Sequence, residues 1–176
     1  RHLLADGYPF VLDMKASRPG YLRDMVSGRD MVDLFTFYAS SPLGMNHPAL
    51  AGDSEDAASF RERLMDAALN KVANSDVYTP HLARFVETFS RVGIPPELPH
   101  AFFVSGGALA VENALKVAFD WKSRKNEAKG SSASGGKVLH LREAFHGRSG
   151  YTMSLTNTDP NKTARFPTFD WPRIDT

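Results

Sequence analysis

Two short turns hold the residues whose types and spacing point to chemistry. The first is Ser105-Gly106-Gly107-Ala108, which follows the apolar run AFFV and precedes a stretch with helical character. The start of a helix carries unpaired N–H groups and the positive end of the helix dipole, so it attracts anions. Gly106 and Gly107 leave no side chain between the backbone and such an anion. The turn therefore predicts a phosphate site, with a tight turn that only relieves crowding as the alternative.

The sequence around this first turn matches neither of two common nucleotide-binding motifs. SGGALAVE lacks the Gly-Lys-Ser/Thr ending of a phosphate-binding loop of the ATPase type. It also lacks the G-x-G-x-x-G spacing of a dinucleotide site. The identity of the anion must therefore come from another part of the chain.

The second turn is Phe145-His146-Gly147-Arg148, which three residues separate from the apolar run KVLHL. Open α/β sheets bind their ligands where parallel strands end. An aromatic face at that place stacks on a flat heterocycle, and the planar guanidinium of Arg148 fits a carboxylate. An ordinary surface turn with a buried Phe145 is the alternative. Together the two turns suit a phosphorylated aromatic cofactor, of which pyridoxal phosphate (PLP) is the common cytoplasmic example.

The elements around the two turns are predicted to be a strand, a helix and a second strand. The apolar runs at 101–107 and 137–141 suit buried strands, and residues 109–126 have helical character. This order is the unit of a parallel sheet covered by helices. On the helix, Glu112 and Lys116 are expected to form an exposed pair, because residues four apart are neighbours on a helix surface.

The beginning of the chain is predicted to form a small antiparallel piece followed by a long loop. Short runs rich in Tyr, Phe and Val suit strands at 8–13 and 31–37. The polar segment that follows them, up to residue 53, has a length typical of functional or disordered loops.

Two helices are predicted between this loop and the first turn. Apolar residues recur at helical spacing from residue 55 to 70 and again from 80 to 92. In the second of these helices, Thr79 suits the N-cap, Pro80 the first turn and Gly93 the position where the helix ends.

Composition excludes several classes of function. The 176 residues carry a formal net charge of +1 and no cysteine, so disulfides and thiolate chemistry are excluded. The lysine-rich stretch at 122–137 lacks interleaved aromatics and suits a solvated loop, and we expect no nucleic-acid partner. No apolar stretch reaches membrane-spanning length and no signal-peptide pattern is present, so we expect a cytoplasmic protein without a membrane partner. We expect no metal site.

With these two turns, the sequence resembles the class III, PLP-dependent aminotransferases of fold type I. SGGALAVENALKVA resembles their phosphate-binding strand-helix motif, and FHGRS resembles their motif of an aromatic residue followed by His-Gly-Arg-Thr/Ser. Three longer stretches are similar to the branch of the family that uses the side-chain amine of lysine. They are FYASSPLGMNHPAL, NSDVYTPHLARFVETF and SLTNTDPNKTARFPTFDWPRI.

The resemblance implies the fold and the cofactor contacts. The fold class would be α/β, aspartate aminotransferase-like, with the N-terminal part of the small domain and an active-site loop at 1–53. The start of the large domain with its mixed sheet would lie at 54–176. Gly107 and Ala108 would bind the cofactor phosphate, Phe145 would stack on the ring and His146 would line the site. The family commonly has Thr at the position of Ala108, so one hydroxyl contact is missing here.

The resemblance also implies substrates and a reaction. Arg148 would bind a carboxylate of 2-oxoglutarate or glutamate, and Ser41, in the loop at 40–44, would line the substrate entrance. The ε-amino group of L-lysine would pass to 2-oxoglutarate, giving 2-aminoadipate 6-semialdehyde and glutamate. Lysine breakdown and supply of a β-lactam precursor fit this chemistry equally. A homodimer is implied, because the active sites of the family take residues from both subunits.

Two parts of the family's catalytic apparatus do not occur in these residues. The Asp-Glu-Val/Ile-Gln-x-Gly motif is missing, and none of the lysines has the setting of a Schiff-base lysine. The chain starts at Arg1 rather than Met, so we expect an N-terminal fragment that is inactive by itself. Two alternatives stay open. One is a class III enzyme with another donor (ornithine, 4-aminobutyrate or a diamine), and the other is a non-catalytic module that binds a phosphate-bearing ligand.

Overall fold

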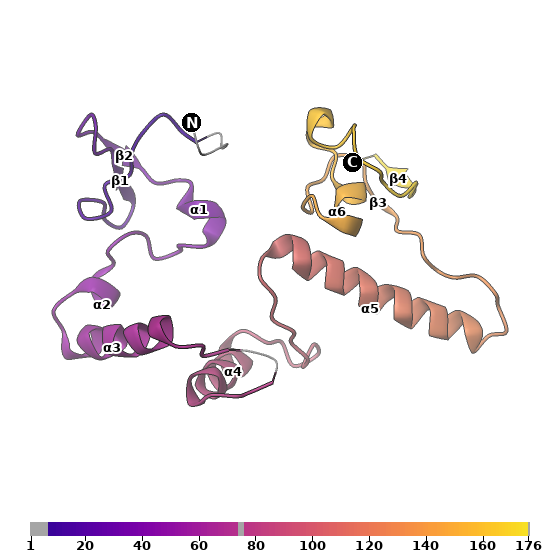
Figure 1. Ribbon diagram of the computed structural model, residues 1–176, viewed down its shortest axis with the longest axis horizontal. Coiled ribbons are helices and arrows are strands. Elements are labelled where there is room, and N and C mark those ends of the chain that lie inside the picture. Colours follow the sequence, from indigo (N-terminus) through magenta and orange to yellow (C-terminus); the bar gives the residue numbers. More distant parts are fainter. Residues whose placement is uncertain (1–6, 74–75, 176) are drawn as a thin grey trace. The chain divides into compact units, whose positions relative to one another are not determined.

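A computed structural model describes residues 7–73 and 76–175. The chain forms two compact units, Arg1–Gly93 and Ile94–Thr176, which we describe separately. Figure 1 labels the helices and strands of both. The predicted domain boundary at residue 53 stays a prediction.

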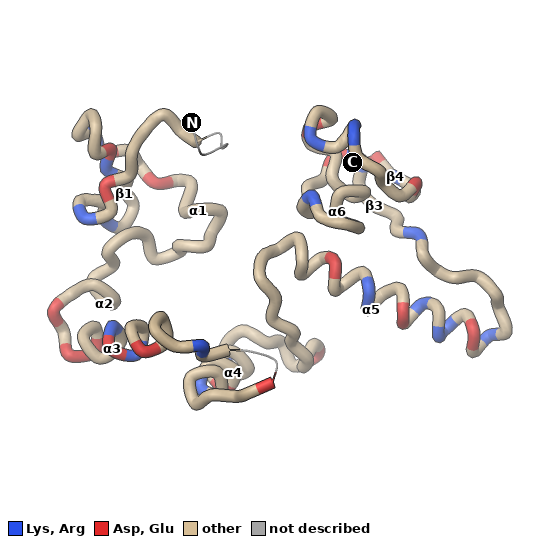
Figure 2. Tube along the Cα trace, in the orientation of Figure 1, with Lys and Arg blue, Asp and Glu red and all other residues tan. Residues whose placement is uncertain are grey.

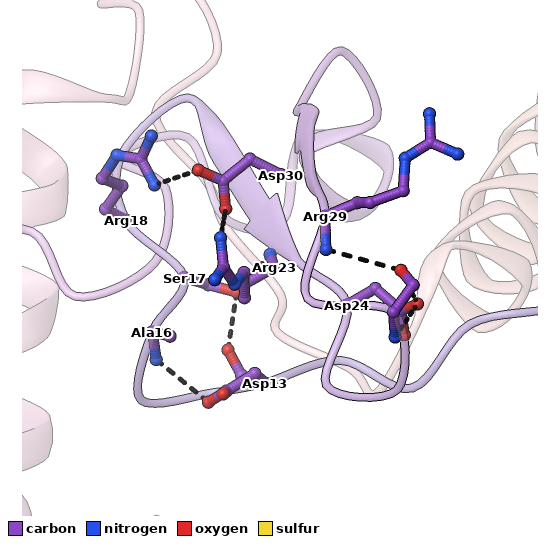
Figure 3. Close-up of polar contacts among 9 residues, drawn as sticks. Asp13, Ala16, Ser17, Arg18, Arg23, Asp24, Arg29 and Asp30 are labelled. Atoms are coloured by element: carbon purple, nitrogen blue, oxygen red, sulfur yellow. Dashed lines mark hydrogen bonds and ion pairs between the residues drawn. The ribbon is translucent and has the colours of Figure 1, made fainter.

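The first unit begins with a short hairpin. β1 (Tyr21–Arg23) pairs antiparallel with β2 (Asp30–Val32), and Leu22 on β1 is buried opposite Met31. The Asp30 carboxylate accepts from Arg18 on one oxygen and from Arg23 on the other (Figure 3). These contacts join the start of the hairpin to its second strand.

Asp24 organises the turn between the two strands. Its carboxylate accepts the hydroxyl of Ser27 and the backbone N–H groups of Ser27, Val11 and Val26. These hydrogen bonds, the Ser27 hydroxyl first among them, lower the pKa of Asp24 from 3.8 to about 2. The ionised carboxylate is therefore the form that holds this turn together.

The predicted strands at 8–13 and 31–37 are largely wrong. The strand that pairs with β2 is β1 and not residues 8–13. Residues 8–13 make one isolated bridge, from Leu12 to Asp24. Strand β2 ends at Val32, since the buried Asp33 carboxylate accepts the N–H groups of the second and third residues after it and turns the chain. The α1 segment (Thr36–Ala39) then has φ between 46° and 62°, which makes it a single left-handed turn.

The helices of the first unit agree closely with the prediction. After α2 (Pro48–Ala51), α3 spans Glu55–Leu69 and is capped by the Ser54 side chain. The next helix, α4 (Pro80–Val92), starts after Thr79, whose hydroxyl accepts the N–H of Leu82, and stops before Gly93. Apolar spacing was therefore sufficient to place α3, and local capping signals placed α4.

The second unit is built around one long helix, α5 (Gly107–Glu127). Figure 2 shows acidic and basic residues interspersed along it, as expected for a helix with a solvated side. The helix α6 (Gly150–Leu155), the short 3₁₀ helix η1 (Pro160–Lys162) and two short strands complete the unit. These strands, β3 (His140–Leu141) and β4 (Arg173–Ile174), pair in parallel.

An aromatic cluster packs α5 against the rest of this unit. Phe119 on α5 contacts Tyr151 on α6 and the buried Trp171, with ring centroids 5.5 and 5.9 Å away. Trp171 also stacks on Phe169 at 5.0 Å. The cluster holds α5 and α6 in a fixed arrangement, which is what positions the two turns at their N-terminal ends.

The strand predicted at 101–107 is wrong, and the one at 137–141 is correct only for its last two residues. Residues 101–104 form no strand, and Phe102 is 77% exposed. A strand requires a hydrogen-bonded neighbour, and β3 pairs with β4 rather than with this run. The parallel pairing was expected, but its partner lies downstream in the sequence. In the described ranges, no helix is long and apolar enough to cross a membrane.

Candidate functional site

The first component of the candidate site is the uncapped start of α5. Gly106 precedes the helix with φ 89° and ψ 154°, and no side chain caps it. By contrast, Ser54 and Thr79 cap α3 and α4. The first intrahelical bond donated here comes from Ala110, whose N–H binds the Gly106 carbonyl. The earlier N–H groups of this long helix are therefore available to an anion.

Space at this helix start is consistent with a bound anion. A Cβ atom built on Gly106 or Gly107 would meet no other atom within 4 Å, so neither glycine is needed to relieve crowding. The alternative of a tight turn that only avoids crowding is therefore not supported. The positive φ of Gly106 gives this glycine a conformational reason, and no neighbouring side chain lies against either glycine.

The second turn packs directly against the first. Gly147 is buried with φ 114°, and a Cβ atom built on it would lie 2.5 Å from the Ala108 Cβ and 3.0 Å from the Ala108 Cα. Glycine is required here on both counts, since an added methyl group has neither the space nor the backbone conformation it needs. The structure thus brings together the two turns that the sequence singled out.

Buried hydroxyl groups fix the path of the second turn. Thr156, which is 2% exposed, donates its hydroxyl to the Gly147 carbonyl at 2.6 Å and accepts the N–H of His146 at 3.0 Å. One residue further on, the N–H of Asn157 binds the carbonyl of Ala144 at 2.9 Å. The backbone from 144 to 147 is therefore held by hydrogen bonds to the segment that follows α6.

The start of α6 is held by a capping box and by one carboxylate. Ser149 and Thr152 cap each other, and the Ser149 N–H lies 3.1 Å from the Thr152 Oγ1. Glu112 on α5 accepts the Ser149 hydroxyl at 3.1 Å and the Thr152 N–H at 3.0 Å, both on Oε1. The predicted surface pair of Glu112 with Lys116 is wrong, because Glu112 is 8% exposed and its carboxylate binds α6.

The candidate ligand-binding side chains of the second turn point outward. Phe145 is 61% exposed, which removes the alternative of an ordinary turn with a buried Phe145. Arg148 is exposed and forms no ion pair with any residue in the described ranges, while His146 is half-buried. An exposed aromatic face and an unpaired guanidinium next to a helix start suit a ligand with a ring and negative groups.

Ser41 belongs to the first unit. Its N–H binds the carbonyl of Thr36, its own carbonyl accepts from Gly44, and Gly44 packs on the backbone of Pro19. The next residues are anchored by Asn46, whose side-chain amide donates to backbone carbonyls near the hairpin. The loop at 40–44 is thus ordered on its own unit, and its place at a substrate entrance stays a prediction.

Sequence reasoning missed the residues that hold the site together. Glu112, Thr152 and Thr156 support the turns without being exposed themselves. A signal for Glu112 existed, because it precedes the half-buried Leu115 and Phe119 by three and seven residues, which places it on the packed side of α5. No comparable local signal marks the two threonines, whose role depends on contacts between elements.

The residues fit a PLP molecule in chemical terms. The uncapped start of α5 supplies N–H donors for a phosphate, Phe145 an aromatic face and Arg148 a cation for a carboxylate. All of them lie within the second unit, and Gly147 against Ala108 fixes the contact between their two turns.

Known proteins match this chain closely. The L-lysine-epsilon aminotransferase of Mycobacterium tuberculosis H37Rv is 64% identical over 176 residues, which cover 99% of this chain and 38% of that protein. The protein of the same name from Streptomyces clavuligerus is 56% identical over 99% of this chain and 37% of its own length. The chain thus spans less than half of the length of these relatives.

A solved structure is also similar to this chain over nearly its whole length. Lysine aminotransferase from M. tuberculosis in the internal aldimine form superposes with a TM-score of 0.91 and 62% identity, covering 99% of this chain and 40% of that one. The predicted α/β fold of the fold type I transferases is confirmed. The family model Aminotransferase class-III matches residues 4–175. The chain therefore belongs to the class-III aminotransferase family.

Proposed function

We propose that the full-length protein containing this chain is an L-lysine 6-transaminase. It would transfer the ε-amino group of L-lysine to 2-oxoglutarate and release 2-aminoadipate 6-semialdehyde and L-glutamate. The observation that carries the proposal is the 64% identity, over 99% of this chain, to a protein named L-lysine-epsilon aminotransferase. The packing of the two candidate turns against each other supports it.

The proposed cofactor is PLP, which supplies an electron sink for breaking a bond next to the amine nitrogen. In this proposal the N–H groups at Gly107 and Ala108 bind its phosphate, where the helix dipole favours negative charge. Phe145 stacks on the ring and His146 lines the site. Ala108 brings no hydroxyl to the phosphate, so the backbone N–H groups supply the contacts on this side.

The proposed substrate contacts are Arg148 and Ser41. Arg148 would bind a carboxylate of 2-oxoglutarate or glutamate through its planar guanidinium, which matches a carboxylate with two parallel hydrogen bonds. Ser41 would line the entrance used by the substrate. The Schiff-base lysine that moves the proton is assigned to a part of the enzyme outside these residues, since the motif context for it does not occur here. A homodimer and a cytoplasmic location are the accompanying predictions.

The proposal is tested by the visible absorption of the purified full-length protein loaded with PLP. We expect a cofactor band that disappears when L-lysine is added, because the amino group is transferred to the cofactor. Ornithine and 4-aminobutyrate, added separately at the same concentration, serve as controls and should leave the band largely unchanged. A band that responds to either control more readily than to lysine would assign a different donor. A protein without any band would favour the non-catalytic module.

A further inference from the structure

Glu112 is a buried acidic residue that connects the two turns of the candidate site. It lies on α5, five positions after Gly107, and is 8% exposed. Both hydrogen bonds to its Oε1, from the Ser149 hydroxyl at 3.1 Å and from the Thr152 N–H at 3.0 Å, come from the start of α6. The carboxylate therefore joins the helix that begins at the first turn to the helix that begins after the second.

The chemistry of this contact favours one defined arrangement. Burying a carboxylate is unfavourable unless donors surround it, so α6 must present the Ser149 hydroxyl and the Thr152 N–H at the right places. The start of a helix also favours a negative group. An apolar side chain would fill the same space without fixing the direction in which α6 begins.

Arg148 lies between two anchor points on α5. On its N-terminal side, Gly147 packs against Ala108, because a Cβ atom built on Gly147 would lie 2.5 Å from the Ala108 Cβ. On its C-terminal side, the Ser149 hydroxyl binds Glu112, and a Cβ on Gly150 would lie 3.2 Å from the Glu112 Oε1. Only Arg148 separates these contacts, so its backbone is set by α5 on both sides.

We infer that Glu112 is a positioning residue that fixes Arg148 and the preceding Phe145-His146 pair relative to the start of α5. Its role is to set the spacing between the phosphate-binding turn and the turn that binds the ring and a substrate carboxylate. The inference rests on the proposed function and deepens it, because it assigns the accuracy of the site to a residue that touches neither cofactor nor substrate.

The test uses the full-length protein with PLP and compares Glu112→Gln with Glu112→Ala. The amide oxygen of Gln still accepts both hydrogen bonds, whereas Ala removes the acceptor. We expect Glu112→Ala to raise the Kd for PLP and the KM for 2-oxoglutarate by about ten-fold or more, the range for losing hydrogen bonds to a charged group. Glu112→Gln should leave both quantities within about 1.5-fold of wild type, because both hydrogen bonds are kept.

A destabilising substitution elsewhere separates positioning from a general loss of stability. Leu22→Ala removes a buried side chain from the hairpin of the other unit, which holds none of the proposed PLP contacts, so it should lower Tm and leave the Kd for PLP within about two-fold. If Glu112→Ala yields no folded protein, Ser149→Ala removes one of the two donors and should raise both constants about three-fold.

The inference is overturned if Glu112→Ala or Ser149→Ala leaves the Kd and the KM at wild-type values. It is also overturned if Leu22→Ala raises the Kd for PLP as much as Glu112→Ala does. Either result would leave the proposed function intact, provided that the wild-type protein binds PLP and uses 2-oxoglutarate. A wild-type protein that binds no PLP would contradict the proposed function itself.

Discussion

Arg148 is the residue through which the site would recognise a substrate acid. It is exposed, unpaired within the described ranges, and follows a glycine whose position is fixed by Ala108. A guanidinium with no internal partner retains all of its donors for a ligand. This separates it from Arg142, which already pairs with Asp175.

Replacing Arg148 tests this role. Arg148→Gln should raise the KM for 2-oxoglutarate by roughly ten- to a hundred-fold, because a charged, two-pronged hydrogen bond to the carboxylate is lost. Steady-state assays of glutamate formation provide the measurement. The matched control is Arg142→Gln, which removes one exposed arginine of the same unit and should leave the KM unchanged. Equal effects of the two substitutions would remove Arg148 from substrate binding.

Asp24 is a residue whose charge stabilises the hairpin. Its pKa is lowered from 3.8 to about 2 by the Ser27 hydroxyl and neighbouring N–H groups, so folding favours the ionised form. This contribution is present above the ordinary pKa of 3.8 and is lost as the pH falls toward about 2.

Asp24→Asn should therefore lower Tm at neutral pH and lose its effect in acid. The difference in Tm between wild type and variant should shrink as the pH is lowered from about 4 to about 2, since the carboxyl group of the wild type becomes increasingly protonated over this range. Thermal unfolding across a pH series gives the measurement, and Asp53→Asn, at an exposed position, is the control. A difference that does not depend on pH would show that the ionised form of Asp24 is not what holds the turn.

At the level of elements, the site depends on the contact of the second turn with the start of α5. Gly147 makes this contact possible through a positive φ of 114° and the absence of a side chain. The contact is supported by the aromatic cluster of Phe119, Tyr151 and Trp171, which packs α6 onto α5. Any side chain at position 147 would have to push the two turns apart.

Gly147→Ala should therefore weaken both folding and cofactor binding. A residue with a Cβ at this φ costs roughly 1–3 kcal/mol, to which the overlap with Ala108 adds. We expect a lower Tm and a PLP affinity reduced by about ten-fold or more, measured by thermal unfolding and by PLP titration. Gly136→Ala is the control, because a Cβ there meets only the Ser134 hydroxyl at 3.6 Å. Wild-type PLP affinity in Gly147→Ala would show that the contact between the turns is not required.

Helices were predictable from the sequence because their signals are local. Thr79, Pro80 and Gly93 mark the limits of α4, and the predicted start of α5 was two residues too late. Strands were not predictable in this way, because a strand depends on a partner elsewhere in the chain. The run at 101–104 has the composition of a strand but no ladder, whereas Arg173 and Ile174 pair with β3 without any conspicuous pattern.

For the candidate site, the residues of the two turns were predictable from the sequence, but the residues that support them were not. Glycine, phenylalanine and arginine in the two turns are recognisable by type, so their proximity could be proposed before the structure placed Gly147 on Ala108. The supporting residues Glu112 and Thr156 act through contacts over 37 and 9 positions of sequence. No local pattern marks the contact of Thr156. The surface pair expected for Glu112 followed from its spacing to Lys116, although its spacing to the half-buried Leu115 and Phe119 indicated the packed side of α5.

At the scale of the whole molecule, the proposed function assigns to this chain the binding of cofactor and substrate and not the complete catalytic centre. It matches 38% of the length of its M. tuberculosis relative, and the lysine expected to carry the cofactor is assigned outside it. We therefore expect the 176-residue chain by itself to show no transamination. Turnover by this isolated chain, with L-lysine and 2-oxoglutarate, would contradict that assignment of the catalytic lysine.

The rate of L-glutamate formation from 2-oxoglutarate by the full-length, PLP-loaded protein, measured with different amine donors, tests the proposed function most sharply. We expect glutamate to form with L-lysine, dependent on PLP and accompanied by 2-aminoadipate 6-semialdehyde. Ornithine and 4-aminobutyrate should give a kcat/KM lower by about ten-fold or more. Ornithine is one methylene group shorter than lysine, and 4-aminobutyrate has a shorter chain and no α-amino group. No glutamate with lysine, or a higher kcat/KM with either of the other donors, would rule out L-lysine as the preferred amine donor.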